Sequence, residues 1–393
     1  MDLLVIGNLF LLLFLGLADN QTVPALLPLL IDSLHISVEQ AGLLAVFYSA
    51  AAALASLVTG VVSDHYGRKP FLILGALVFG VASWMAAGTQ SFAGLTVARG
   101  LTGLGAGAIS TCSIAFAGDW FAYNVRGRAL SVISTAYFVA PILGVPLAAQ
   151  IAGRLGWRAT FYFFAVLAAA VALLSTRLPR EKREAGPASE RWQATFRACR
   201  SFFARRDTHA GLVIAFLVSG GLYGFIFYIG QWLHAAFGVA TGTIGWVFML
   251  GGVVAVVGAP VAGSLSDRWG KRPVSILGNV VLAVSVALIP LFPWGIGLLV
   301  VFGVTSLGAA TRQGPLTALM TELVPSAERG SFIALRNVFS QTGIGLVVLA
   351  GGAIYEWHGY IAVTTLCAAM TFLVAILLAT HIVEPRPAGD RRP

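Results

Sequence analysis

A single carboxyl side chain lies in the middle of a long apolar run, where a charge is costly. Residues 3–18 carry no charged side chain, and Asp19 follows them directly. A helix that starts at Leu3 rises about 1.5 Å per residue, which places Asp19 roughly 24 Å along it and well inside a bilayer. No other acid of the chain falls so deep in an apolar run. Acids at this depth often relay protons or bind ions, so the chemistry suggested is proton uptake and release.

Arg99 is the cation best placed to meet Asp19. It lies seven residues into the apolar run 92–117, about 10 Å from the start of that run, so both side chains reach similar depth. Burial favours the neutral form of a carboxyl group, whereas a nearby guanidinium favours the carboxylate. If Arg99 moves away, Asp19 binds a proton, and the return of Arg99 releases it. The structural alternative is a fixed ion pair, although buried pairs add little net stability.

Further polar and aromatic side chains at middle depth are candidates for a substrate cavity. Arg312 lies near the end of the run 295–322, where it either contacts substrate or extends toward the membrane surface. Two cavity arginines against one acid would favour an anionic or zwitterionic substrate. The other candidates, for which helix packing is the alternative explanation, are Asn20, Gln21, Tyr48, Tyr137, Tyr223, Tyr228, Asn337 and Gln341.

The elements that position these residues are predicted to be membrane-spanning helices. The 393-residue chain is 58% apolar and 10% charged, with a mean hydropathy of +0.86, whereas soluble proteins are about 25% charged. Backbone groups in lipid need internal partners, which helices supply, and the runs lack the alternation of barrel strands. The predicted spans are 3–31, 40–62, 70–89, 92–117, 129–152, 159–177, 210–236, 242–263, 273–292, 295–322, 330–353 and 360–381.

The net charge of +9 is distributed as membrane topology requires. With the N-terminus inside, the cytoplasmic segments hold nearly all Lys and Arg, among them Arg329 and Arg336, whereas Arg154 and Arg158 fall outside. The N-terminal run lacks a basic segment and a cleavage site, so it predicts a first helix and not a signal peptide. We expect a multi-pass protein of the inner (plasma) membrane, embedded in the lipid bilayer, with both termini cytoplasmic and no nucleic-acid partner.

The sequence contains two similar halves. GVVSDHYGRKP, which starts at Gly60, returns 203 residues later as GSLSDRWGKRP, which starts at Gly263. GLTGLGA from Gly100 matches GVTSLGA from Gly303 at the same offset. A repeat on this scale predicts two bundles of six helices each, over residues 1–177 and over residues 209–393 with a short cytoplasmic tail.

A charged linker, residues 178–208, is predicted to join the two bundles in the cytoplasm. Several of its apolar residues fall on one face of a helix that is surrounded by arginines, which predicts an amphipathic helix on the inner leaflet. A solvated linker is the alternative. The apolar face consists of Trp192, Phe196, Cys199 and Phe203.

These motifs resemble those of the major facilitator superfamily of secondary transporters, over essentially the whole chain. The two basic loops are similar to its signature loop between helices 2 and 3 and to the echo of that loop between helices 8 and 9. LTVARGLTGLGAG from Leu95 resembles the helix 4 motif, and LADNQTVPALLP from Leu17 resembles the helix 1 motif of twelve-helix drug:proton antiporters. AYFVAPILGVP from Ala136 departs from the antiporter motif of helix 5, because Ala140 and Val145 replace glycines. The resemblance implies an all-α integral membrane fold of twelve transmembrane helices, in two six-helix halves related by pseudo-two-fold symmetry, with substrate between them.

The two basic loops also predict conformational latches. The carboxylates of Asp64 and Asp267 can each meet the positive N-terminus of a helix in the other half, near Arg329 and Arg126 respectively. Such contacts would close the cytoplasmic side and break when it opens. A loop that only sets topology is the alternative. The latch residues are Gly60, Asp64, Gly67, Arg68, Lys69, Arg126, Asp267, Gly270 and Arg329.

Together these features indicate a secondary active transporter that works by alternating access. Proton-coupled efflux of small lipophilic or amphiphilic compounds, drugs included, is the favoured function. The alternatives are a carrier of organic anions, metabolites or lysolipid-like amphiphiles, by symport or uniport, and a transporter-derived membrane sensor. The sequence shows no phosphate-binding loop, metal motif or catalytic triad, so we expect no enzyme activity, cofactor or metal. One chain supplies both halves of a cavity, which favours a monomer.

Overall fold

The computed structural model describes residues 2–179, 201–325, 329–382 and 384, and nearly all of them are helical. The N-terminal half contains α1 (Leu3–Leu34), α2 (Val38–Tyr66), α3 (Arg68–Gly88), α4 (Phe92–Trp120), α5 (Tyr123–Ser134), α6 (Ala136–Val139), the π-helical η1 (Ala140–Gly144), α7 (Val145–Leu155) and α8 (Trp157–Ser175). The C-terminal half contains α10 (Arg206–Phe237), α11 (Thr241–Trp269), α12 (Lys271–Leu288), η2 (Ile289–Leu291), α13 (Ile296–Glu322) and α14 (Arg329–His381).

Eleven helices in the described residues are long and apolar enough to cross a membrane. One of them, α14, has 53 residues and reverses direction at Gly359, where φ is 76°. This helix therefore supplies two spans, and α5 to α7 together form one, so the described chain supplies twelve. The predicted all-α membrane fold is confirmed.

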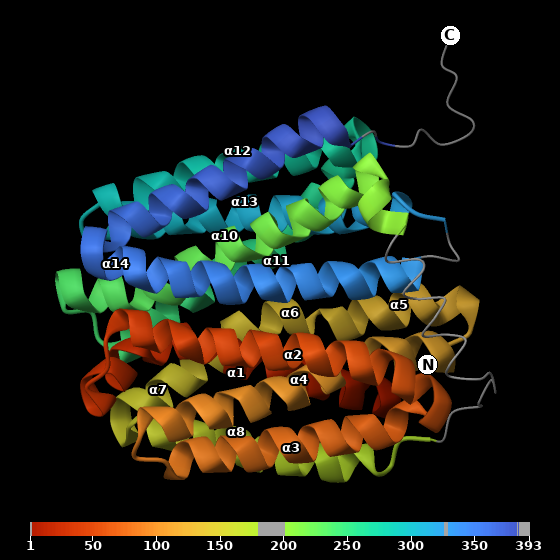
Figure 1. The fold of residues 1–393 in the computed structure, drawn as a ribbon, viewed down its shortest axis with the longest axis horizontal. Helices are drawn as coiled ribbons and strands as arrows, with labels where there is room; N and C mark the ends of the chain where they lie inside the picture. Colours follow the sequence, from red (N-terminus) through yellow and green to blue (C-terminus); the bar gives the residue numbers. More distant parts are fainter. Residues whose placement is uncertain (1, 180–200, 326–328, 383, 385–393) are drawn as a thin grey trace.

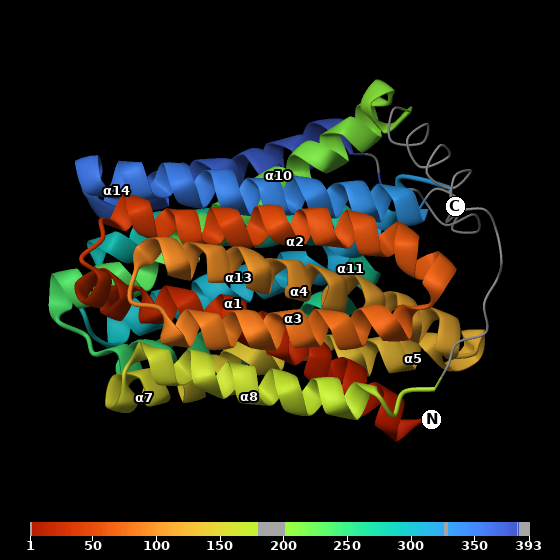
Figure 2. The ribbon, with the colours of Figure 1, turned by 60° about the horizontal axis from the view of Figure 1, so that its bottom comes forward.

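The two halves meet along α2 and α14, which lie side by side in both views (Figures 1 and 2). The pairs α1 with α10 and α7 with α11 complete the boundary between the halves. We call the end of the bundle where α2, α4, α11 and α13 finish the linker end, on the right in Figure 1. The end where α1, α3, α7 and α10 finish is the far end.

Local capping residues set the helix starts at the far end. The Ser37 hydroxyl accepts from the Gln40 N–H at 3.0 Å, and the Gln40 side chain accepts from the Ser37 N–H at 3.0 Å. This capping box satisfies two of the N–H groups that a helix start leaves unpaired. At α4 the Ser91 hydroxyl accepts from the N–H three residues on, at 3.1 Å. These caps fix the register of α2 and α4, which carry Tyr48 and Arg99 into the bundle.

Glycine ends α2 and α11 at the two basic loops. Gly67 has a φ of 90° and Gly270 a φ of 97°, in a region that residues with a Cβ rarely adopt. Their N–H groups donate to the Ser63 and Ser266 carbonyls, both at 2.9 Å. The two loops therefore share this glycine conformation and this hydrogen bond, as the sequence repeat predicts.

In each loop, the basic residue that directly follows the glycine forms an ion pair inside its own half. Arg68 Nε lies 3.2 Å from Asp119 Oδ2 at the end of α4, and Lys271 Nζ contacts Glu322 Oε1 at the end of α13. Glu322 follows Asp119 by the same 203 residues that separate the loops. Each pair therefore joins the third helix of its half to the end of the fourth.

The next basic residue of each loop donates hydrogen bonds to carbonyl groups near the end of the last helix of its half. Lys69 Nζ donates to the Thr176 carbonyl at 2.6 Å, where α8 ends. Arg272 Nη2 donates to the Ala379 carbonyl near the end of α14. Lysine and arginine near helix C-termini satisfy carbonyls that lack an intrahelical partner. Each loop is therefore a clasp that fastens the helices of one half together.

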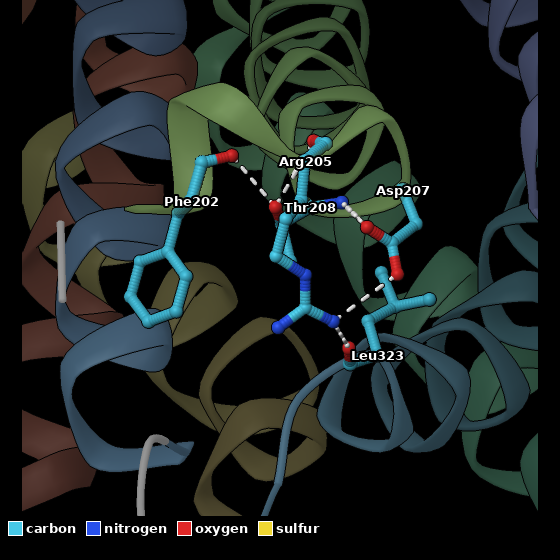
Figure 3. A network of polar contacts seen from close by, with 5 residues as sticks. All are labelled: Phe202, Arg205, Asp207, Thr208 and Leu323. Atoms are coloured by element: carbon cyan, nitrogen blue, oxygen red, sulfur yellow. Dashed lines mark hydrogen bonds and ion pairs between the residues drawn. The ribbon is translucent and has the colours of Figure 1, made fainter. Parts of the chain in front are cut away.

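A compact network fixes the point where the linker enters α10 (Figure 3). Thr208 Oγ1 donates to the Phe202 carbonyl at 2.6 Å, and the Thr208 N–H donates to Asp207 Oδ1 at 2.8 Å. Arg205 Nη2 donates to the Leu323 carbonyl at 3.1 Å, just after α13. The last residues of the linker are therefore anchored to the C-terminal half.

The predicted amphipathic helix of the linker falls mostly on residues that the structure does not describe. Phe203, which belongs to its apolar face, is described and is half-exposed, with its ring centroid 6.0 Å from that of Phe339. Phe202 is buried, 5.4 Å from the ring of Phe332. The described end of this segment therefore packs on the C-terminal half. The residues of the face outside the described range are Trp192, Phe196 and Cys199.

Candidate coupling and substrate site

Asp19 on α1 and Arg99 on α4 form an ion pair inside the N-terminal half. Arg99 Nη1 lies 2.6 Å from Asp19 Oδ2, and 3% and 0% of the respective side chains are exposed. The contact predicted from helix depth is therefore present and direct. Because both side chains are inaccessible to solvent, the pair can change its protonation state only if the helices around it move or water enters.

The pair leaves part of its hydrogen-bonding capacity unused. Asp19 Oδ1 and Arg99 Nε are buried without a partner among the described residues. The Tyr48 ring lies over the guanidinium, with its centroid 4.6 Å from Arg99 Cζ, which partly compensates the charge through a cation–π contact. A buried polar atom without a partner costs about 1–3 kcal/mol. These unpartnered atoms lower the net contribution of the pair to stability.

The fifth span changes its winding next to Asp19. It is π-helical over Ala140–Gly144, a stretch that contains Pro141, which has no N–H to donate. A Cβ on Gly144 would lie 2.6 Å from the Cβ of Ala18, so α1 and η1 touch one residue away from Asp19. Single π-helical turns occur often at functional sites. The π-turn gives the fifth span a local irregularity at the depth of the buried pair.

Four candidate residues come from helices of both halves: Tyr48 on α2 and Tyr137 on α6, and Tyr223 on α10 and Arg336 on α14. We call them the central residues. Of these, Tyr48 contacts the buried pair directly, through its ring over the Arg99 guanidinium.

Tyr137 is partly accessible, with 48% of its surface exposed. The other predicted cavity residues with partial or full exposure are Asn20, Gln21, Tyr223, Asn337 and Gln341.

Tyr228 and Arg312 lie in the packed interior of the C-terminal half, with no surface exposed. Tyr228 Oη donates to the Val348 carbonyl at 2.6 Å. Arg312 donates to Asn279 Oδ1 at 3.0 Å and to the Val218 carbonyl at 3.1 Å. The structure therefore leaves neither side chain accessible, and Arg312 does not extend to the membrane surface. The position of a residue along its helix can be predicted from the sequence. Whether its side chain faces the other half or its own half depends on how the helices pack.

Arg336 is the functional candidate that sequence reasoning missed. The charge distribution predicts a cytoplasmic position for it, but it lies seven residues into α14. Its Nε is buried without a partner among the described residues. Its position inside the predicted span 330–353 was the signal that could have found it.

The described side chains do not form the predicted latches at the linker end. Asp267 is exposed and makes no ion pair with a described residue. Arg126 Nε donates to the Phe121 carbonyl of its own half at 3.3 Å. The side chains of Asp64 and Arg329 lie outside the described part of the structure. The latches therefore stay a prediction, for a state in which the linker end is closed.

Hydrogen bonds between the halves lie at the far end. The Glu39 N–H at the start of α2 donates to Glu356 Oε1 on α14 at 2.9 Å. Gln150 Nε2 on α7 donates to the Gly242 carbonyl on α11 at 3.1 Å. A carboxylate at a helix start is stabilised by the unpaired N–H groups there. The far end is therefore joined by polar contacts that the linker end lacks among the described residues.

Glycines bring the halves into backbone contact from the middle of the bundle to the far end. A Cβ on Gly230 of α10 would lie 2.4 Å from the Pro24 carbonyl oxygen of α1. A Cβ on Gly252 of α11 would lie 2.7 Å from Ile142 of η1. Side chains at these positions would hold the halves apart.

The groups that this site presents are a carboxylate, two guanidinium groups and several phenol hydroxyls. The described part of the chain contains no group of three or more His, Cys, Asp or Glu that could hold a metal ion. A carboxyl group in this setting can exchange protons, and guanidinium and phenol groups can bind oxyanions through hydrogen bonds. The arrangement therefore suits proton exchange and ligand binding.

Replacing one residue of the Asp19–Arg99 pair is expected to destabilise the protein more than replacing both. Asp19→Ala leaves a buried guanidinium that cannot lose its proton, and should lower the free energy of unfolding by about 3–5 kcal/mol. Arg99→Gln should be milder, because Asp19 can become neutral by binding a proton. The double variant should be more stable than Asp19→Ala alone. Chemical denaturation in detergent micelles measures all four proteins, and additive effects would contradict a coupled pair.

Comparison with known proteins identifies the family. The family model described as Major Facilitator Superfamily matches residues 9–239 and 211–393. The Multidrug resistance protein MdtL of Escherichia coli O6:H1 is 27% identical over 365 residues, 91% of this chain and 88% of that protein. A probable 4-methylmuconolactone transporter of Cupriavidus pinatubonensis is 27% identical over 347 residues, 85% of this chain and 79% of that protein.

A solved structure shares the fold across nearly the whole chain. It is a bacterial homologue of the human lysosomal transporter Spinster, crystallised in an inward-facing and unoccupied conformation. The TM-score is 0.78 at 17% sequence identity, with 97% of this chain and 98% of that chain covered. The repeated basic loops, the twelve spans and the matching family model lead to one assignment: this chain is a transporter of the Major Facilitator Superfamily.

Proposed function

We propose that this transporter exports small lipophilic or amphiphilic compounds in exchange for protons, with Asp19 as the coupling acid. The observation that carries the proposal is the buried Asp19–Arg99 pair with unused hydrogen-bonding atoms. Tyr48, one of the central residues, contacts that pair through the Arg99 guanidinium. In this proposal the protein acts as a monomer in the inner membrane, with the linker end and both termini in the cytoplasm.

The proposed cycle follows from a competition for the carboxylate. Contact with Arg99 favours the charged form of Asp19, and loss of that contact favours the protonated form. When the halves rock and the fifth span shifts at its π-turn, Arg99 separates from Asp19, which then binds a proton from the far side. The return of Arg99 expels that proton to the linker side. Substrate in the space between the halves would favour one of these arrangements, which links its movement to that of the proton.

Two relatives support different substrate classes. MdtL carries the name of a multidrug resistance protein, which supports lipophilic compounds. The Cupriavidus relative is named a probable 4-methylmuconolactone transporter, which supports a carrier of small metabolites or organic anions. Arg336, whose Nε is buried without a partner among the described residues, favours this second candidate. Net flux through the purified protein would exclude the remaining alternative, a membrane sensor.

Flux into proteoliposomes tests the proposal directly. The vesicles contain the purified full-length protein, and lipophilic cations, organic anions and lysolipid-like amphiphiles are offered with and without an imposed pH gradient. We expect at least one class to accumulate against its own gradient when the vesicle interior is acidic. Downhill movement that ignores the pH gradient for every class would contradict proton coupling.

A further inference from the structure

We infer that Glu356 is a conformational latch that holds the far end closed, because its carboxylate caps the start of α2 across the boundary between the halves. Glu356 belongs to α14, and its Oε1 accepts from the Glu39 N–H of α2 at 2.9 Å. The latch determines which end of the protein is open. The inference therefore does not depend on which substrate is carried or on whether protons drive its movement.

The carboxylate of Glu356 is placed unfavourably for its own helix and favourably for α2. The first arm of α14, residues 329–358, ends just before Gly359, three residues after Glu356. A helix C-terminus carries a partial negative charge and an N-terminus a partial positive one. At the start of α2 the capping box uses the Gln40 N–H and leaves that of Glu39 to Glu356. Glu356 therefore gains this stabilisation only while α2 and α14 are in contact.

Glycines let α2 and α14 approach closely enough for this contact. A Cβ on Gly352, one turn before Glu356, would lie 2.8 Å from the Cα of Glu39. On the facing helix, a Cβ on Gly42 would lie 3.2 Å from the Val348 carbonyl oxygen. Small residues at a helix interface allow such close backbone approach. Because the backbones touch here, a small separation of the halves at the far end would break the 2.9 Å hydrogen bond.

The junction of α7 with α11 corresponds to this one in the sequence repeat, but it lacks the carboxylate. Gly242, the second residue of α11, follows Glu39 by 203 residues, and Glu356 follows Gly153 of α7 by the same offset. The positions also correspond in space, because a Cβ on Gly153 would lie 3.7 Å from the Gly242 nitrogen. Gln150 donates to the Gly242 carbonyl there instead. The fold therefore does not require an acid at this position, and the far end is held by a carboxylate on the α2–α14 side.

The α2–α14 pair can carry a latch at each end. The two helices run in opposite directions, so the start of each lies beside the end of the other. Glu356 serves the start of α2 at the far end, and Asp64 near the end of α2 is predicted to serve the start of α14 at the linker end. Closure of one end would thus replace one latch with the other. Loss of Glu356 should therefore shift the balance toward an open far end.

Distances between spin labels at the far end test the latch. The labels are attached at Gln90→Cys, between α3 and α4, and at Pro293→Cys, between η2 and α13. Both positions are exposed, and they correspond to each other in the repeat. The full-length protein, with its three native cysteines replaced by alanine, is measured in lipid nanodiscs without substrate or a pH gradient. Long distances indicate an open far end and short distances a closed one.

Glu356→Ala should raise the ratio of open to closed far ends by about two- to fivefold, the factor that corresponds to one carboxylate at a helix start. Glu356→Gln keeps an acceptor oxygen without the charge and should cause a smaller shift. Gly153→Glu places a carboxylate at the corresponding junction, where a Cβ meets the Gly242 nitrogen at an ordinary contact distance. It should lower the ratio by a similar factor, and in the Glu356→Ala protein it should restore closed far ends.

The matched control is Gly153→Gln, which adds a side chain of the same size without a charge and should change the ratio little. An unchanged ratio in Glu356→Ala would overturn the inference, as would equal shifts by Gly153→Glu and Gly153→Gln. If Glu356→Ala does not fold, Glu356→Gln and Gly153→Glu provide the same comparison. Because no substrate or pH gradient is used, failure of proton coupling leaves the result unaffected.

Discussion

Asp19→Asn is expected to abolish accumulation of substrate against its gradient and to leave downhill exchange intact. With the membrane potential collapsed, a one-for-one exchange of protons for substrate gives about tenfold accumulation across a gradient of one pH unit. Asn cannot bind and release a proton, so accumulation should fall to the equilibrium level. The amide oxygen can still accept from Arg99, which preserves the 2.6 Å contact and with it the packing of α1 on α4. Flux in proteoliposomes with an acidic interior measures the change.

Asp32→Asn is the matched control for this variant. Asp32 also lies on α1, but it is exposed at the far end, where its Oδ2 lies 4.0 Å from His234 Nε2 of α10. An exposed pair of this kind contributes about 0–1 kcal/mol. Its replacement removes a carboxyl group of the same helix without touching the buried pair, so accumulation should match that of wild type. Downhill exchange by Asp19→Asn shows that the variant is folded. Undiminished accumulation by Asp19→Asn would assign the coupling to another group and leave Asp19–Arg99 as a structural pair.

Gly230→Val is expected to prevent closure of the far end. A Cβ at this position would lie 2.4 Å from the Pro24 carbonyl oxygen, and the obstacle is backbone that cannot rotate away. The halves would have to separate there and would close at the linker end instead. The overpacking should disfavour the present arrangement by about 1–3 kcal/mol or more. Transport should fall by at least about tenfold, because one conformation of the cycle becomes rare.

Distances between spin labels reveal this shift. The labels are attached at Arg128→Cys on α5 and Arg268→Cys on α11, two exposed positions in different halves at the linker end. The distance between the two labels should be shorter in the Gly230→Val variant than in the labelled protein that keeps Gly230. Gly303→Val is the control, because a Cβ on Gly303 meets only an ordinary contact at 3.8 Å. An unchanged distance distribution in Gly230→Val, with normal transport, would contradict the proposed movement of the halves.

The fold follows from the sequence with little ambiguity. Each span needs about 20 apolar residues, and the loops between spans are short, so the helix boundaries were predicted to within a few residues in most cases. The largest departure is the fifth span, where the uniform helix predicted over 129–152 begins earlier and contains the π-turn at Ala140–Gly144. A missing N–H at Pro141 predicts an interrupted hydrogen-bond ladder. The form that the interruption takes depends on the contact of Gly144 with α1.

The site was only partly predictable. A sequence shows how deep in the membrane a residue lies along its helix, but it does not show which neighbouring helix the side chain faces. Asp19 and Arg99 were paired correctly because each is the single charge at that depth of an apolar run. Arg312 lies at a comparable distance inside its helix, yet it points into its own half toward Asn279. Arg336 lies closer to a helix start, yet its Nε is buried without a partner among the described residues. These directions are set by the packing of α10, α12 and α14, which no local pattern contains.

The two clasps have a consequence for the order in which the protein is made. Lys69 emerges early in synthesis, but its carbonyl partner Thr176 belongs to the last helix of the first half. The first clasp can therefore close only after six spans have been inserted, and nothing from the second half is needed to close it. The second clasp depends in the same way on Ala379, near the end of the chain. In each half, these contacts form only after its last helix has been made. The nascent chain can therefore assemble as two successive units before they dock.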